Sequence, residues 1–434
     1  MRGDWATVKF GEVLSGGTRN GIYKKKEYRG SGVKIVNMGE LFAYPRLRAI
    51  PMKRVELTEK ELKKSSLEPG DLLFARRSLV AEGAGKYSIV LEVDESTTFE
   101  SSIIRGRPDP DEADSLFLYY LFNSPHGRYL LGTIRRQVAV AGITGSDLVQ
   151  LEISLPPLSE QRAIAHILGS LDDKIELNRR MNETLEAMAQ AIFKSWFVDF
   201  DPVRAKAAGR DTGLPGEIAD RFPDSFEDSE LGDVPRGWEV KPLDKIADFL
   251  NGLACQKYPP KNGEESLPVI KIRELRQGIT DNTDRATVDV PSKYIVEDGD
   301  ILFSWSGSLL VDIWCQGRGV LNQHVFKVTS EDFPRWFYFY WTTYHLNEFQ
   351  RIAAYKATTM GHIKRHHLSD AKVLVPSAPL LDSMTESIDS LVEQRINNEL
   401  QKQTLATLRD TLLPKLISGE LRVSDAEKFM GVNR

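Results

Sequence analysis

The chain has 434 residues, of which 41% are hydrophobic and 27% are charged, which is enough for roughly two to four domains with ordinary cores. Its two cysteines, Cys255 and Cys315, both fall in the second half, so they are not a duplicated disulfide or metal pair, and we expect reduced thiols in a cytoplasmic protein. The first residues lack an apolar signal core, and the longest apolar run, residues 116–122, is too short to cross a bilayer. We therefore expect a cytoplasmic protein with no membrane association.

The sequence repeats itself. Residues 67–74, LEPGDLLF, return as residues 296–303, VEDGDILF. From Phe117 onward the second copy follows at a constant offset of 220 residues, so that Phe117 matches Phe337 and Leu171 matches Leu391. A repeat of this length predicts two similar domains, because solenoid repeats are much shorter.

Each copy has the same order of expected elements. In the first half, short β-rich runs are separated by Gly and Pro, and one aromatic helix is expected at 116–131. The expected strands of the first half are 33–36, 71–74, 87–91 and 151–155. The second half repeats them at 269–272, 300–303 and 371–375, with a helix at 336–351. Each half therefore predicts a mixed α/β domain.

A long helix is expected after each domain, following the proline steps at 156–157 and 376–379. Ser159 is the expected N-cap of the first helix, and Ser383 with Glu386 resembles a capping box one turn inside the second. Apolar residues recur at alternating spacings of four and three, which is typical of a coiled-coil seam. The residues expected to pair the helices are Leu168, Leu171, Ile175, Asn178, Asn182, Leu185, Ile388, Leu391, Asn398, Leu405 and Leu408.

An antiparallel pairing of the two helices would bury both apolar stripes and place one domain at each end. The polar residues Asn178, Asn182, Asn398 and Lys402 would then fix the register. The alternative is that these residues face solvent beside an imperfect stripe.

Charge is distributed unevenly along the chain. The formal net charge is −5, but residues 199–233 hold ten acidic and four basic residues, and the remainder is close to neutral. This Pro- and Gly-rich segment is expected to cross the surface in extended form. Basic clusters occur in both domains, which gives weak support for a polyanionic partner.

Catalytic and metal-binding signatures are missing from both copies. The segment 83–88, GAGKYS, lacks the spacing of a phosphate loop, and His362 with His366 lacks an acidic partner for zinc. No carboxylate pair or nucleophile recurs in both halves. The chain is therefore interpreted as a non-catalytic reader that binds no metal and no cofactor.

Three segments carry a family resemblance: LPPLSEQRAI at 155–164 with LDDKIELN at 171–178, WFVDFDPV at 196–203, and FPDSF at 222–226 with GDVPRGW at 232–238. Together with LPKLISGEL at 413–421, they resemble the specificity subunit of type I restriction-modification enzymes. The resemblance covers the whole chain and is strongest at 155–238.

The resemblance implies an α+β pseudo-two-fold tandem repeat, in which two target recognition domains are separated by two long helices packed as an antiparallel coiled coil. Each domain would read one half of a split double-stranded DNA target. The implied segments are the first recognition domain (1–157), the first spacer helix (158–200), the acidic connector (201–232), the second recognition domain (233–378), the second spacer helix (379–418) and the C-terminal tail (419–434).

The resemblance also implies partners. Two methyltransferase subunits would dock on the helices, and a restriction and motor subunit would join them. S-adenosylmethionine, ATP and Mg²⁺ would belong to those partners and not to this chain. Two alternatives stay open: a self-contained methyltransferase or nuclease with a fused reader, disfavoured because no cofactor loop is present, and a coiled-coil adaptor that does not bind DNA.

Residues that contact DNA are expected in loops after matched strands and in nearby basic segments, since lysine and arginine grip phosphates and a few side chains reach base edges. In the first domain the candidates are Lys34, Arg76, Arg77, Ser78, Lys86, Arg135, Arg136 and Thr144. In the second domain they are Lys271, Arg273, Ser304, Trp305, Ser306, Lys356, Thr358, Thr359, His362 and Lys364. The target bases and the spacer length do not follow from the sequence.

Overall fold

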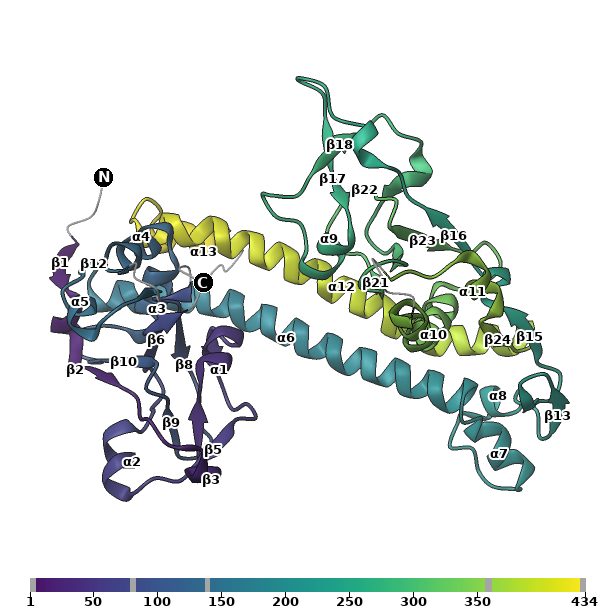
Figure 1. Ribbon diagram of the computed structural model, residues 1–434, viewed down its shortest axis with the longest axis horizontal. Helices are drawn as coiled ribbons and strands as arrows, with labels where there is room; N and C mark the ends of the chain where they lie inside the picture. Colours follow the sequence, from purple (N-terminus) through teal and green to yellow (C-terminus); the bar gives the residue numbers. More distant parts are fainter. Residues whose placement is uncertain (1–4, 79–82, 137–140, 356–360, 430–434) are drawn as a thin grey trace. The chain divides into compact units, whose positions relative to one another are not determined.

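The computed structural model describes residues 5–78, 83–136, 141–355 and 361–429 (Figure 1). The chain forms two compact units. Unit 1 holds the residues up to 174 and those from 405 onward, and unit 2 holds residues 175–404. Two helices of 40 residues, α6 (Leu158–Phe197) and α12 (Ala378–Ile417), contribute to both units. In the described part of the chain, no helix is long and apolar enough to cross a membrane.

Unit 1 is built around a five-stranded sheet of order β2-β10-β6-β8-β4 and a three-stranded sheet of order β5-β3-β9. Its helices, besides parts of α6 and α12, are α1 (Met38–Ala43), α2 (Glu59–Ser65), α3 (Ser115–Asn123), α4 (Pro125–Thr133), α5 (Gly145–Leu148) and α13 (Val423–Phe429). Its strands are β1 (Ala6–Lys9), β2 (Leu14–Asn20), β3 (Arg29–Val36), β4 (Arg46–Leu47), β5 (Lys53–Val55), β6 (Leu72–Ala75), β7 (Arg77–Ser78), β8 (Tyr87–Val90), β9 (Thr97–Phe99), β10 (Ile103–Pro108), β11 (Ala141–Gly142) and β12 (Glu152–Leu155).

Unit 2 contains two four-stranded sheets, of order β16-β23-β20-β21 and β18-β17-β22-β19. Its own helices are α7 (Asp201–Ala207), α8 (Gly216–Ala219), α9 (Ile272–Gln277), α10 (Arg335–Tyr355) and α11 (Arg365–Asp370). Its strands are β13 (Phe226–Ser229), β14 (Gly232–Pro235), β15 (Glu239–Pro242), β16 (Asp248–Asn251), β17 (Ser266–Ile270), β18 (Arg285–Thr287), β19 (Ile295–Val296), β20 (Ile301–Ser304), β21 (Leu310–Ile313), β22 (Gly319–Leu321), β23 (Val325–Thr329) and β24 (Lys372–Val375).

The two units share a topology, as the sequence repeat predicts. In each, a strand near the start of the domain pairs antiparallel with the last strand before a long helix: β1 with β12, and β15 with β24. The order β2-β10-β6-β8 corresponds to β16-β23-β20-β21. The parallel pair β3–β9 corresponds to the parallel pair β17–β22. The predicted α+β tandem repeat is therefore confirmed.

The repeated Gly-Asp motif forms the same turn in both units. Gly70 and Gly299 have φ of 95° and 91°, a left-handed conformation that favours glycine. The carboxylate of Asp71 accepts from the backbone of Glu68 at 2.8 Å, and that of Asp300 accepts from Glu297 at 2.7 Å. These hydrogen bonds fix the entry to β6 and β20, which explains why the motif recurs.

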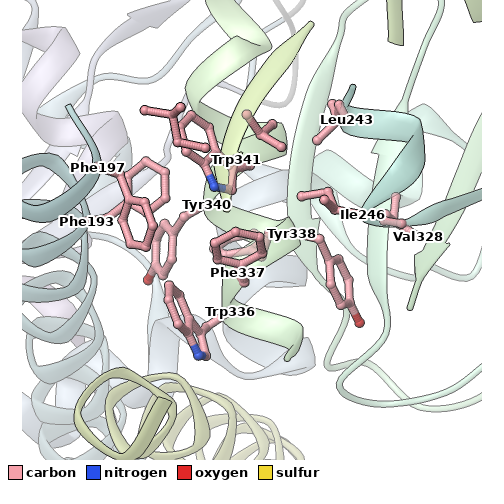
Figure 2. Packing of buried hydrophobic residues seen from close by; sticks show 14 of the residues in the cluster. Phe193, Phe197, Leu243, Ile246, Val328, Trp336, Phe337, Tyr338, Tyr340 and Trp341 are labelled. Carbon is pink, nitrogen blue, oxygen red and sulfur yellow. The ribbon is translucent and has the colours of Figure 1, made fainter. Parts of the chain in front are cut away.

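Aromatic side chains pack each long helix against its domain. In unit 2, Phe193 and Phe197 of α6 lie against α10, whose Trp336, Phe337, Tyr340 and Trp341 are buried (Figure 2). The Phe197 ring centroid lies 5.7 Å from those of Phe337 and Trp341. In unit 1, Phe117 to Phe122 of α3 are buried in one core with Ile164, Leu168 and Leu171 of α6.

Two local predictions are wrong. The aromatic helix of the first copy is interrupted, because Ser124 caps a new helix that begins at Pro125, a residue that cannot continue α3 but suits a first helical turn. Ser159 lies inside α6 and is not its N-cap, and Ser383 lies about one turn inside α12, as expected, but does not cap it. Ser383 is instead buried, and its hydroxyl donates to the carbonyl of Pro379 at 3.1 Å.

The acidic connector is also not extended throughout. It contains α7, α8 and β13, and β13 forms a hairpin with β14. The Lys206 ammonium donates to the carbonyl of Ala219 at 2.9 Å and thereby joins these pieces. A stretch rich in Pro and Gly can be ordered when a long side chain satisfies its carbonyls.

The long helices pack antiparallel within each unit. In unit 2, Asn178 of α6 donates to Gln401 of α12 at 2.7 Å, and Asn182 donates to Glu399 at 3.4 Å. In unit 1, Leu168 and Leu171 are buried, and Leu405 and Leu408 of α12 pack against their cluster. Of the other residues expected to pair the helices, Ile388 and Asn398 are buried, and Ile175, Leu185 and Leu391 are partly buried.

Candidate nucleic-acid interface

Three segments of unit 1 meet where β6 ends. The backbone N–H of Arg76 donates to Ser102 at 2.7 Å, and the carbonyl of Arg76 accepts from Ile143 at 3.0 Å. The next two residues, Arg77 and Ser78, pair with Gly142 and Ala141 as β7 and β11. We call Arg76, Ser102 and residues 142–143 the first corner.

The equivalent segments of unit 2 meet where β20 ends. The backbone N–H of Trp305 donates to His324 at 3.4 Å, and the carbonyl of Trp305 accepts from Ile363 at 3.0 Å. Ser306 forms an isolated bridge with His362. We call Trp305, His324 and residues 362–363 the second corner. Because the backbone hydrogen bonds match those of the first corner, Arg76 and Trp305 occupy equivalent positions.

In the first corner, the predicted residues are basic or polar. Arg76 is half-buried and Arg77 is exposed. The exposed Arg136 forms an ion pair with Asp147 at 2.7 Å, and its backbone bridges to Gly142. Thr144 caps α5 by accepting from Asp147 at 3.2 Å. The first corner therefore offers guanidinium groups, which bind phosphate or guanine edges well.

Three further predicted residues lie close to the first corner in sequence. Ser78 is half-buried. Lys86 is exposed, and its ammonium lies 5.0 Å from the ring centroid of Phe42. Arg135 is half-buried, and its Nε is buried without a hydrogen-bond partner in the described part of the chain.

The second corner is aromatic. The Trp305 indole Nε1 donates to Asn251 Oδ1 at 3.0 Å, and the ring stacks on Phe326 with centroids 5.8 Å apart. His362 is exposed and meets Trp305 edge-on at 6.2 Å. Beside them lies a cavity of about 320 Å³ lined by Asn251, Trp305, Phe326, His362, Ile363, Lys364 and Arg365.

Besides Arg136, three predicted lysines and arginines have their charges paired within the fold. Lys34 is buried and contacts Asp94 at 2.8 Å and Glu95 at 3.2 Å, and the hydrogen bond to Asp94 raises the pKa of Lys34. Lys271 pairs with Asp284 and thereby lowers the pKa of that carboxyl. Arg273 donates to the buried Glu274 at 2.7 Å. These groups are less available to a phosphate than the residues of the corners.

Two predicted serines of the second domain lie inside the fold. Ser304 is fully buried, and its hydroxyl donates to the carbonyl of Ser308 at 2.8 Å, so it is inaccessible to a ligand at the surface. Ser306 is 3% exposed and hydrogen-bonds His324 Nδ1 at 3.0 Å. Lys364 is exposed. Lys356, Thr358 and Thr359 fall outside the described residues.

Asn251, His324 and Arg365 surround Trp305 and were not among the residues predicted from the sequence. The repeat could have pointed to Asn251, because Asn20-Gly21 and Asn251-Gly252 are equivalent in the two copies. Asn20 pairs with Ile104, and Asn251 pairs with Phe326. A Cβ at Gly21 would lie 2.2 Å from the carbonyl oxygen of Glu100, and one at Gly252 would lie 2.3 Å from that of Asn322. Both copies therefore need a glycine after this asparagine.

Within the described residues, no group of three His, Cys, Asp or Glu side chains could hold a metal ion.

A sequence profile described as "Type I restriction modification DNA specificity domain" matches residues 2–187 and 235–406. The chain belongs to this type I restriction-modification DNA specificity family. It is therefore a DNA specificity subunit, a non-catalytic subunit of a type I restriction enzyme.

Known specificity subunits resemble the whole chain. The type I restriction enzyme MjaIX specificity subunit of Methanocaldococcus jannaschii is 27% identical over 433 residues, covering 97% of this chain and 94% of that protein. The HindI specificity subunit of Haemophilus influenzae is 25% identical, covering 82% and 88%. A crystal structure of the specificity subunit from M. genitalium covers 95% of this chain and 96% of its own, with a TM-score of 0.58 and 15% identity. It shows that the fold is shared.

Proposed function

We propose that this specificity subunit binds a bipartite double-stranded DNA target and that each recognition domain reads one half-site through its corner. The observation that carries this proposal is the equivalence of Arg76 and Trp305, which have the same backbone hydrogen bonds but different side-chain chemistry. A conserved frame with different reading residues suits a protein that reads two different sequences.

The domain arrangement follows from the segments expected from the sequence: recognition domains at 1–157 and 233–378, joined by spacer helices at 158–200 and 379–418, with the acidic connector at 201–232 and a tail at 419–434. A helix of 40 residues is about 60 Å long, which would set the unread spacing between half-sites. The candidates that remain accessible for DNA are Arg76, Arg77, Arg136, Lys86, Trp305, His362 and Lys364.

We further propose that two methyltransferase subunits and a restriction and motor subunit assemble on this chain. Leu177, Met181 and Met188 of α6 are 56%, 38% and 49% exposed, and their spacings of four and seven residues place them on one face of the helix. An exposed apolar stripe of this kind suits a protein partner. S-adenosylmethionine, ATP and Mg²⁺ would be bound by those partners, and the assembly would act in the cytoplasm.

Co-expression with the methyltransferase subunits, followed by genome-wide mapping of methylated bases, tests the proposal. We expect one motif with two specified halves and a fixed unspecified spacer. A contiguous motif, or methylation without sequence preference, would contradict it.

Incubation of the purified chain alone with DNA and labelled methyl donor should give no methylation. A titration at several salt concentrations should show a falling log–log slope, which a non-binding adaptor would not.

A further inference from the structure

The hydrogen bonding of Trp305 restricts how the second corner can read DNA. Its only donor, the indole N–H, is used by Asn251 Oδ1 at 3.0 Å. The ring therefore offers no free hydrogen-bonding group to a base edge, and any contact that it makes with a base is apolar.

The neighbours of Trp305 extend this apolar character. Phe326 is 5% exposed and Ile363 is 3% exposed, and both line the cavity of about 320 Å³ beside the indole. The guanidinium of Arg365 lies 5.7 Å from the Phe326 ring centroid and donates to the carbonyl of Phe249 at 3.1 Å. The inner wall is thus aromatic and aliphatic, and the guanidinium at its edge is already hydrogen-bonded.

The charge around this cavity suits a nucleic acid. Lys364 and Arg365 are exposed at its edge, and His366 follows them on α11. None of the residues that line this cavity in the described part of the chain carries a carboxylate. A phosphate backbone can therefore approach the edge while a base edge faces the apolar wall.

We propose that the cavity beside Trp305 receives the 5-methyl group of a thymine in the half-site read by unit 2. Thymine is the one base that presents an apolar group in the major groove, so an apolar pocket at a reading position selects it over cytosine. The first corner has Arg76 at the equivalent position, and an arginine can donate two hydrogen bonds to the edge of a guanine. This inference rests on the proposed function, and it adds the chemistry of one base contact.

The test uses the full chain assembled with its methyltransferase subunits and duplexes that contain the mapped target. Each thymine of both half-sites, on either strand, is replaced in turn by deoxyuridine, which removes only the methyl group. We expect at least one replacement to weaken binding about fourfold, the loss for one buried methyl. In the Trp305→Ala variant this replacement should have no effect, whereas Trp305→Phe should keep most of it.

Arg351→Ala, which removes an exposed side chain of α10, serves as the control and should keep the wild-type response to deoxyuridine. The inference is overturned if no replacement weakens binding, or if the loss persists in Trp305→Ala while Trp305→Phe is folded and bound. It is also overturned if 2-aminopurine placed in the target becomes strongly fluorescent only when Trp305 is present, since the cavity would then hold an unstacked base. Failure of the proposed function is distinct, because sequence-specific binding itself would then be absent.

Discussion

Tyr120 of α3 donates its phenolic hydroxyl to Asp172 of α6 at 2.6 Å. Arg409 of α12 donates to the other oxygen of the same carboxylate at 2.7 Å. Burial and the neighbouring Asp172 raise the pKa of Tyr120 well above its ordinary value, so the hydroxyl stays a donor. One carboxylate therefore links the recognition domain of unit 1 to both long helices.

Unit 2 contains a similar link, again with the carboxylate on α6 and the arginine on α12. Tyr340, which matches Tyr120 in the repeat, donates to Glu186 of α6 at 3.4 Å. Arg395 of α12 lies 3.6 Å from Glu186 and 2.7 Å from Asp312. In unit 1, α6 follows the domain and carries the carboxylate. In unit 2, α12 follows the domain and carries the arginine. The tyrosine therefore occupies equivalent positions in the two copies, whereas the acid and the arginine do not.

Arg409→Ala is expected to lower the free energy of unfolding by about 2 kcal/mol, because it leaves the nearly buried Asp172 without its cation. The figure is below the value for a fully buried pair, since the Arg409 side chain is 26% exposed. Urea denaturation measures the change. Arg351→Ala removes an exposed ion pair with Glu348 and should cost less than about 0.5 kcal/mol. Equal losses in the two variants would contradict the role of Asp172.

Asn398→Leu and Asn178→Leu are expected to change stability in opposite directions. Asn398 is 4% exposed, and its Nδ2 has no hydrogen-bond partner among the described residues, so leucine removes an unpaired buried donor. Its Oδ1 accepts from Gln394 at 2.7 Å, but Gln394 is exposed and can bond to water instead. Asn178 is similarly buried, but its Nδ2 donates to Gln401 at 2.7 Å, so leucine there removes a hydrogen bond that satisfies a buried donor. Thermal denaturation should show a higher midpoint for Asn398→Leu and a lower one for Asn178→Leu. A lower midpoint in both would show that Asn398 is satisfied in solution.

The sequence predicts the frame of this protein better than its reading surface. The repeat and the Gly-Asp motif predict both domains, because glycine at positive φ and a carboxylate that accepts from the backbone are local requirements. The break at Pro125 was missed, because the apolar pattern continues across it. Lys34 was predicted to contact DNA because its ion-pair partners, Asp94 and Glu95, are distant in sequence and cannot be recognised from the residues around Lys34.

The candidate site could likewise be predicted only in part from the sequence. The equivalence of Arg76 and Trp305 follows from aligning the two Gly-Asp strands, and the structure adds matching backbone hydrogen bonds. The partners of Trp305 come from three other segments, at Asn251, His324 and residues 362–365. No local pattern connects these segments, so the cavity could not be predicted from the sequence.

His345 is expected to make stability depend on pH. It is partly buried in α10, its Nε2 donates to the carbonyl of Lys372 at 2.9 Å, and burial lowers its pKa below 6.5. The unfolded chain therefore takes up a proton as pH falls through about 6.5, while the folded chain resists until a lower pH. Stability from the neutral ring is present above pH 6.5 and is lost as pH falls toward the folded pKa.

The variant that tests this dependence is His345→Gln, whose side-chain amide can still donate to a carbonyl but does not titrate. Urea denaturation at pH 7.5 and 5.5 should show a smaller loss for His345→Gln than for the wild type. The exposed His126, changed to Gln in the same way, provides the matched control and should behave like the wild type. An identical pH dependence in all three proteins would exclude His345 as the titrating group.

Arg76→Ala is expected to relax sequence preference in one half-site and leave the other unchanged. The backbone of Arg76 is held at both ends, by Ser102 and Ile143, so its side chain projects from a fixed point. A bidentate contact with guanine is worth roughly tenfold to hundredfold in discrimination against the wrong base. Competition binding with single-base variants of the mapped target measures this, and Arg351→Ala controls for the lost charge. If Arg76→Ala instead weakens binding to all variants by the same factor, Arg76 contacts phosphate and the first half-site is read by other residues.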